Sequence, residues 1–216
     1  MPPSREGITK DRIVTAAMDL FGRQGYQATS VAQLEAAAGL SAGAGGLYRH
    51  FPSKRAVLEE GLRRQAAAGR GLIAFIEDPG LLSNLPPRER LLAVARAGLR
   101  RLEEERDLNR LLLRDLSVFP DLLEQVKNSE LRRVFDAVAG WLRGQAAEQA
   151  AGQPEVDWDA VAAVLMAAVS HYWIMRDVYS GVHPHGISED RFLAAAADLA
   201  SRLFPSPGAA TSRPAS

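Results

Sequence analysis

The 216-residue sequence contains no cysteine. This absence excludes a disulfide-stabilised secreted scaffold, a thiolate zinc site and a cysteine nucleophile. Long hydrophobic runs are also missing: the longest is Ala160–Val169, ten residues, whereas about 18 are needed to span a bilayer. The first residues lack the apolar stretch of a signal peptide. We therefore expect a soluble, cytoplasmic protein with no membrane partner.

The sequence has no excess of positive or negative charge, because 26 Lys and Arg residues balance 26 Asp and Glu residues. The balance is uneven along the chain. Residues 1–70 hold ten basic and six acidic side chains, a net charge of +4, and the remainder carries −4. A basic N-terminal segment on an acidic body is compatible with nucleic-acid binding at one end. A hydrophobic content of 47% is enough to build a core.

Alternating patterns of β-branched residues are absent, and apolar residues recur every three or four positions nearly throughout. Glycine and proline separate these segments. We predict an all-α protein of about nine helices with three parts. These are an N-terminal domain at 8–62, a C-terminal domain at 63–204 and a Pro/Ala/Ser-rich tail at 205–216, which we expect to be disordered.

The N-terminal domain shows local helix signals. Thr9 is predicted to cap the first helix, and Gly25 to end it in the left-handed conformation. Ser30-Val31-Ala32-Gln33 has the form of a capping box that opens a short helix, which Gly39 closes. Another helix should run from Ser53 to about Glu77. A short helix, a glycine turn and a second short element, braced by a preceding helix, are typical of a helix-turn-helix.

One ordered set of residues runs through positions 9–62. Its members are Ile13, Ala17, Leu20, Phe21, Gly25, Tyr26, Thr29, Ser30, Val31, Leu34, Ala38, Gly39, Leu40, Ser41, then Leu47 to Lys54, and Leu58. With this set, residues 9–62 resemble the DNA-binding domain of TetR-family transcriptional regulators. The resemblance implies a helical C-terminal domain that binds a small molecule and dimerises through the last two helices.

Two positions depart from the family pattern. The stretch Ser41–Gly46 is two residues longer than usual, and Glu35 stands where the family has a small alanine. Three glycines within residues 43–46 each disfavour a helix by about 1 kcal/mol relative to alanine. The recognition element could therefore begin late, near Gly45, or order only on DNA. Alternatively, the stretch is simply a lengthened turn.

The resemblance also implies DNA contacts. Tyr48 and Lys54 are expected at phosphates, and Thr29 or Ser30 at the neighbouring strand. Ser41, Ala44 and Arg49 are candidates for base readout, and DNA shape would add to it. Glycine would let the backbone approach the duplex, and His50 would either contact phosphate or pack beneath the recognition helix. The complete predicted DNA-binding set is Thr29, Ser30, Ser41, Ala42, Gly43, Ala44, Gly45, Tyr48, Arg49, His50 and Lys54.

The last two predicted helices, over residues 157–180 and 188–203, are alanine-rich and apolar around much of their circumference. Such helices require burial on more than one side, which favours packing against a second copy of the chain. By resemblance, these helices form the homodimer interface.

Candidate contacts to a small-molecule effector are aromatic and polar side chains of the C-terminal domain. Arg114 in particular could clamp a ligand carboxylate, or it could form a buried or inter-helical ion pair with Asp115. For each aromatic candidate, packing in the core or the dimer interface is the favoured alternative. The predicted ligand set is Arg114, Phe119, Trp141, His171, Tyr172, Met175 and Arg176, with Trp173 and Tyr179 as further candidates.

No metal or cofactor is expected, because His183 and His185 lack a third ligand at helical spacing. No nucleophile motif or phosphate loop is present either. The resulting hypothesis is a non-enzymatic homodimeric regulator, a repressor that a ligand releases from a palindromic double-stranded operator. The alternatives are an activator of the same fold, a helical adaptor without base recognition, and an all-α enzyme using His171, Arg176 and Asp177.

Overall fold

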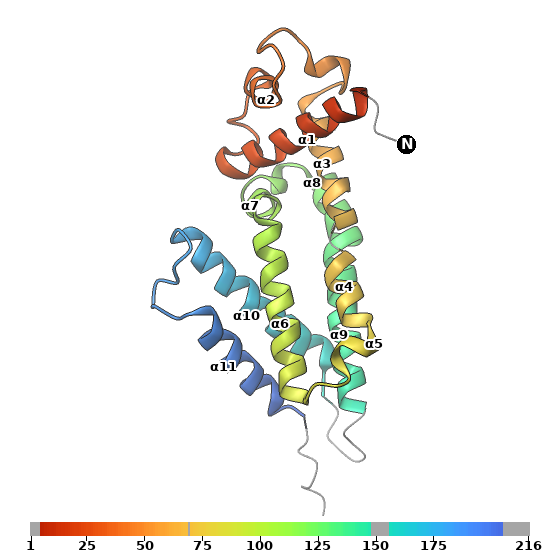
Figure 1. Ribbon diagram of the computed structural model, residues 1–216, viewed down its shortest axis with the longest axis vertical. Helices are drawn as coiled ribbons and strands as arrows, with labels where there is room; N and C mark the ends of the chain where they lie inside the picture. Colours follow the sequence, from red (N-terminus) through yellow and green to blue (C-terminus); the bar gives the residue numbers. More distant parts are fainter. Residues whose placement is uncertain (1–4, 69, 148–155, 205–216) are drawn as a thin grey trace, which may run out of the picture. The chain divides into compact units, whose positions relative to one another are not determined.

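The computed structural model describes residues 5–68, 70–147 and 156–204. All regular structure within these ranges is helical (Figure 1), so the all-α prediction is confirmed. The predicted tail at 205–216 lies outside the described residues. The elements are α1 Arg5–Gln24, α2 Val31–Ala37, η1 Leu47–Arg49, α3 Lys54–Ala68, α4 Arg70–Glu77, α5 Pro79–Leu82, α6 Pro87–Glu104, α7 Arg106–Arg114, η2 Leu116–Val118, α8 Pro120–Val126, η3 Lys127–Leu131, α9 Arg132–Ala147, α10 Trp158–Val178 and α11 Glu189–Ser201.

The chain divides into two compact units. The first, here called the head unit, joins Met1–Arg70 to Glu104–Leu131, and the second, the body unit, joins Gly71–Glu103 to Arg132–Ser216. The head unit therefore contains α7, η2, α8 and η3 in addition to the segment predicted to bind DNA. The predicted division at residue 62 cuts the chain once. The two units differ from it because each joins two separate segments that pack together.

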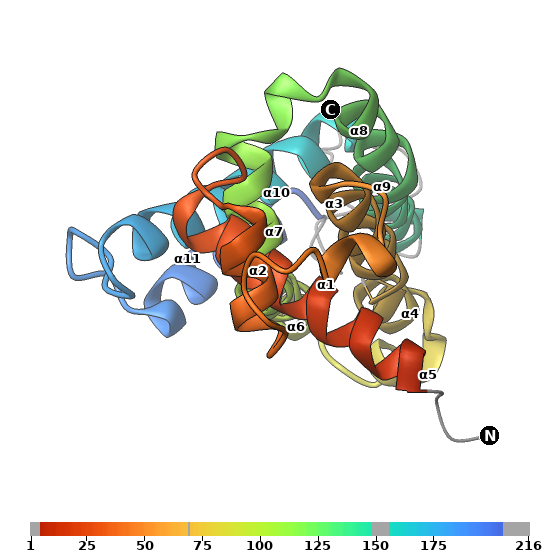
Figure 2. The same cartoon turned by 90° about the horizontal axis from the view of Figure 1, so that it is seen from above.

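The core of the head unit forms around the apolar face of α1, where Ile13, Ala17 and Phe21 are fully buried. This face packs against α3 and α7, and α1 lies beside α7 in both views (Figures 1 and 2). The segment at 104–131 supplies five of the buried core residues: Leu108, Leu111, Leu116, Leu122 and Val126.

The two ends of α1 show one wrong prediction and one confirmed one. The helix begins at Arg5, so Thr9 lies inside it and is not its N-cap. Helix-compatible residues before Thr9 extend the helix, and Glu6 and Lys10 form an i,i+4 ion pair at 3.2 Å. Gly25 follows the last residue with a φ of 98°, as predicted for a left-handed stop.

The body unit is built from α4, α5, α6, α9, α10 and α11. Its core includes Val138 and Leu142 of α9, Ala162 of α10, and Ala197 and Ala200 of α11. The helix predicted from Ser53 to Glu77 is described as α3 and α4, on either side of residue 69.

Both C-terminal helices begin at side-chain caps. Asp157 accepts a hydrogen bond from the Ala160 amide at 3.0 Å, and Ser188 accepts one from the Arg191 amide at 3.4 Å. The predicted Ser188 cap is therefore confirmed. These caps satisfy backbone donors that a helix N-terminus leaves without partners.

Among the described residues, α10 alone has the length and composition of a bilayer-crossing helix. Both properties are shared by core helices of soluble proteins, but only 17% of its most apolar stretch is buried within the chain. Most of its residues are partly buried, and one apolar stripe, with Ala160, Ala163, Val164 and Ala167, is exposed.

Candidate nucleic-acid interface

The first residues of α2 form the predicted capping box. The Ser30 hydroxyl accepts a hydrogen bond from the Gln33 amide at 3.2 Å, and the Ser30 amide donates to Gln33 Oε1 at 2.8 Å. This reciprocal pair, confirmed here, fixes where α2 begins. Ser30 itself is exposed, so its side chain lies at the surface of the head unit.

Thr29 and Lys54 point into the head unit and hold the turn between α1 and α2. The Thr29 hydroxyl, 1% exposed, donates to the Gly25 carbonyl at 2.7 Å. The Lys54 ammonium donates to the carbonyls of Tyr26 and Thr29, each at 2.8 Å, and lies 4.1 Å from the centre of the Tyr26 ring. Burial lowers the pKa of Lys54. Two of the three N–H donors of Lys54 are thus engaged inside the protein. A phosphate contact by Thr29 or Lys54 remains a prediction.

The segment after α2 is a glycine turn followed by a single 3₁₀ turn, η1. Gly43 and Gly45 have φ values of 74° and 72°, which are incompatible with a right-handed helix. Residues 41–44 are exposed, and η1 covers only Leu47–Arg49. The lengthened turn, one of the alternatives left open by the sequence, is what the structure contains, and no α-helix forms between residues 41 and 53.

The side chains of this segment face in two directions. Leu47 and Phe51 are buried in the head unit core, whereas Tyr48 is 57% exposed and Arg49 is exposed. His50 is half-buried, and its Nδ1 atom has no hydrogen-bond partner among the described residues. Tyr48 and Arg49 are therefore available to a duplex together with the exposed residues of the turn.

Sequence reasoning marked Glu35 as a departure but assigned it no partner. Its side chain is fully buried, and its two oxygens accept hydrogen bonds from the amides of Gly43, at 2.7 Å, and Leu47, at 2.9 Å. The signal available in the sequence was the co-occurrence of an acidic residue on α2 with a turn rich in glycine.

Arg114 makes its hydrogen bonds within the head unit. Its guanidinium donates to Asp115 at 2.9 Å and to the carbonyls of Phe21, at 2.5 Å, and Gly22, at 3.1 Å. These carbonyls belong to the last turn of α1, and that of Phe21 also accepts a hydrogen bond from the Gly25 amide at 3.0 Å. Arg114 therefore contacts the last turn of α1 and forms an ion pair with Asp115, and its role as a ligand clamp stays a prediction.

Phe119, another predicted ligand residue, also belongs to the head unit. It packs against the head unit core and meets the Tyr26 ring edge-on, with centroids 4.9 Å apart. This contact is that of a core aromatic residue.

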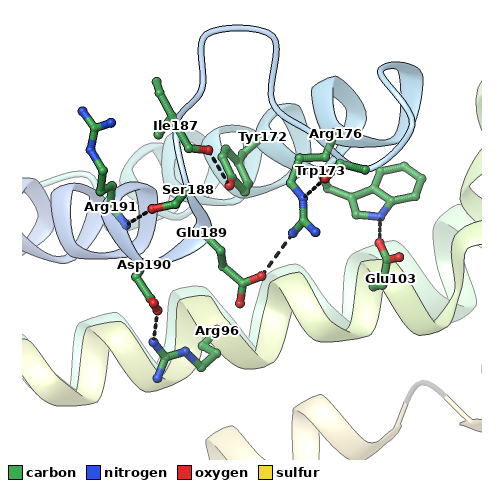
Figure 3. Close-up of polar contacts among 11 residues, drawn as sticks. Arg96, Glu103, Tyr172, Trp173, Arg176, Ile187, Ser188, Glu189, Asp190 and Arg191 are labelled. Carbon is green, nitrogen blue, oxygen red and sulfur yellow. Dashed lines mark hydrogen bonds and ion pairs between the residues drawn. The ribbon is translucent and has the colours of Figure 1, made fainter.

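Tyr172 and Arg176 are brought together at the connection between α10 and α11 (Figure 3). The Tyr172 ring stacks on Phe192 at 4.2 Å, and its hydroxyl donates to the Ile187 carbonyl at 3.0 Å. Arg176 donates to the Gly181 carbonyl at 3.2 Å and to Glu189 at 3.1 Å. Both side chains thus hold the loop between the two helices.

The other predicted ligand residues are dispersed over the body unit. Trp141 is half-buried in the core around α9, Met175 is half-buried and His171 is exposed. Trp173 is buried and donates from its indole nitrogen to Glu103 at 3.1 Å (Figure 3). His183 stacks on Tyr172 at 5.2 Å, and no cluster of three potential metal ligands occurs in the described ranges.

Residues 13–60 match the family model of bacterial regulatory proteins, tetR family. An uncharacterized HTH-type transcriptional regulator of Bacillus subtilis, YerO, is 28% identical over 58% of this chain. The match spans 40% of the length of YerO.

Two solved structures share the fold. A Mesorhizobium loti protein designated as TetR-family is 19% identical with a TM-score of 0.71, covering 93% of this chain and 98% of the other. A Saccharomonospora viridis protein in complex with choline is 24% identical with a TM-score of 0.68, covering 89% and 95%.

Proposed function

We propose that this chain, a DNA-binding transcriptional regulator of the TetR family, acts as a homodimeric repressor that a small molecule releases from a palindromic operator. The observation that carries this proposal is the exposed segment after α2. There Tyr48 and Arg49 point outward from a turn whose buried residues are anchored in the head unit core. A repressor, an activator and a dual regulator would all use this surface, and the position of the operator relative to a promoter distinguishes them.

The proposed contacts at the duplex rest on the exposure of Tyr48, Arg49 and the turn, and on the remaining N–H of Lys54. The Tyr48 hydroxyl and one N–H of Lys54 would bind phosphates, which position the protein without reading sequence. Arg49 would read base edges, and Ser41, Ala42 and Ala44 would lie against the groove. Because the turn offers few side-chain donors, DNA shape would contribute to sequence preference.

The uncovered apolar surface of α10 and α11 supports dimerisation. Val164 and Val178 on α10 and Leu199 on α11 are each at least 65% exposed, and Leu203, just after α11, is 42% exposed. The two helices pack against each other and lie side by side (Figure 1). Exposed apolar patches of this kind mark interfaces, and a two-fold interface would present two head units to a palindrome.

The effector would bind in the body unit, where Tyr172, Trp173 and Phe192 gather beside Arg176. A fold with aromatic residues near a few polar groups suits a small ligand, and the similar Saccharomonospora protein holds choline. We propose that the segment from α3 to α4 transmits ligand binding to the head unit, because it continues from one unit into the other. The effector would favour a state of the dimer in which the distance between the two head units does not match the distance between the two half-sites.

Selection of bound sites from random duplex DNA tests the proposal directly. Full-length protein, shown by light scattering to be a folded dimer, should enrich a palindrome with half-sites about one helical turn apart or slightly more. The target genes near such sites would indicate the chemistry of the effector.

The second candidate is a helical adaptor without base recognition. The observation that favours it is the absence of an α-helix between residues 41 and 53, where a recognition helix would lie. A folded dimer that enriches no sequence would support this candidate against the regulator.

A further inference from the structure

Glu35 is a charged side chain in an unusual place. It lies on α2 and is completely buried, and no ion pair to it occurs among the described residues. An isolated buried carboxylate is strongly unfavourable unless hydrogen-bond donors surround it. Here both oxygens are satisfied by the backbone, one by the Gly43 amide and one by the Leu47 amide.

The two amides stand near opposite ends of the same short stretch. Gly43 lies within the exposed turn, and Leu47 is the first residue of η1. Between them the chain contains Gly45, with a φ of 72°, and Gly46. A glycine-rich stretch loses more conformational entropy on ordering than other sequences, so it needs specific contacts to adopt a single conformation.

The two residues that follow Leu47 face outward. Leu47 is held twice, by its buried side chain and by the hydrogen bond from its amide to Glu35. Tyr48 and Arg49 follow directly in the same 3₁₀ turn. The direction in which these two side chains leave the protein is therefore set by the backbone that Glu35 holds.

We propose that Glu35 is a positioning residue for base recognition. Its carboxylate holds the turn at 41–46 and η1 in one conformation, because it joins both to α2, whereas backbone hydrogen bonds such as those from Ala44 to Ser41 and from Tyr48 to Gly45 act only within the segment. This inference rests on the proposed function, because it assigns the sequence preference of DNA binding to a side chain that does not touch DNA.

The test uses Glu35→Gln in the full-length protein. The amide side chain keeps the shape of glutamate but offers one acceptor oxygen, so its NH₂ group faces one of the two backbone donors. We expect hydrogen exchange at Gly43 and Leu47 in the free protein to become at least tenfold faster, while exchange at Leu111 in the core stays unchanged. Preference for individual bases should fall about tenfold, and the salt dependence of binding should stay the same.

Glu6→Gln is the matched control, because it removes the same charge from the head unit at an exposed position on α1. It should leave both the exchange rates and the base preferences as they are in the wild type. Thermal unfolding of Glu35→Gln checks that the variant is folded before either comparison is made.

Unchanged exchange at Gly43 and Leu47 would overturn the inference, as would unchanged base preferences. A uniform loss of affinity with a smaller salt slope would also overturn it, because it would mean lost phosphate contacts. A wild-type protein that selects no sequence would overturn the proposed function and with it the recognition role. Faster exchange in Glu35→Gln would in that case establish the backbone contact alone.

Discussion

The ammonium group of Lys54 faces inward, onto two carbonyl oxygens of the turn between α1 and α2. A lysine that starts a helix next to a DNA-facing turn has two possible partners, phosphate and the protein itself. In this head unit its inner contacts also include the face of Tyr26. At the scale of single residues, Thr29 and Lys54 therefore stabilise the turn between α1 and α2, which is part of the surface proposed to contact DNA.

Lys54→Ala should lower the free energy of unfolding by roughly 1.5–3 kcal/mol, because hydrogen bonds to a charged group are lost from a partly buried position. Urea denaturation measures this. Lys10→Ala, which removes an exposed i,i+4 pair, should cost about 1 kcal/mol or less. If the third N–H of Lys54 also binds phosphate, the salt slope of DNA binding should fall by about 1. Equal stability of the two variants would contradict the inward role.

Tyr48 and Arg49 are adjacent, and binding assays should separate their roles. Tyr48→Phe removes one hydroxyl, and we expect weaker binding to all sequences by about 1 kcal/mol. Arg49→Ala should cost about 1–3 kcal/mol at particular base pairs and relax preference there. Competition assays against a panel of single-base operator variants measure both. A uniform loss for Arg49→Ala would reassign it to phosphate.

At the scale of elements, local signals predicted helix ends well. The capping box at Ser30, the left-handed Gly25 and the cap at Ser188 depend on residues within a few positions of one another. Such contacts can be recognised from spacing alone. Thr9 shows the limit, because the residues just before it are also helical and place it inside α1.

Contacts between distant elements could not be predicted in this way. Arg114 meets the carbonyl of Phe21, 93 positions away in the sequence. The spacing of apolar residues in α7 does not indicate that Arg114, its last residue, contacts the end of α1. An arginine in an apolar helix is equally compatible with a ligand clamp. The partners of Glu35 lie only eight and twelve positions away, yet they are backbone amides of a turn, and their placement depends on the conformation of the glycines.

Helix α3 carries a pH-dependent contact at Glu60. Hydrogen bonds from Arg63 and, to a smaller extent, Arg64 outweigh burial and lower the pKa of Glu60 from 4.5 to about 2. Because the folded-state pKa is the lower one, the stabilisation is complete above pH 4.5 and is lost as the pH falls toward 2.

Glu60→Gln should therefore destabilise the protein at pH 7 by about 1 kcal/mol or less, since Arg63 is largely exposed. The difference from wild type should shrink between pH 4.5 and 2. Chemical denaturation at a series of pH values measures it, and a difference that stays constant down to pH 2 would contradict the assignment.

At the scale of the whole molecule, the proposed dimer interface can be tested with a closely matched pair of substitutions. Leu199 on α11 and Leu113 on α7 are 65% and 66% exposed, but only Leu199 belongs to the apolar surface of α10 and α11. Leu199→Glu should weaken the dimer by at least tenfold, because it introduces a charge into an apolar contact. Light scattering over a dilution series should then show monomers for Leu199→Glu and dimers for Leu113→Glu. Dimers for both would place the interface elsewhere.

The composition of the head unit has a consequence for how the protein is made. Five of its buried core residues lie between positions 108 and 126, so the nascent chain cannot complete that core when residue 70 leaves the ribosome. Synthesis must first continue through α4, α5 and α6, although N-terminal domains generally fold first during translation. A chain that ends near residue 70 should therefore be less stable than the intact head unit, because its core would lack these five side chains.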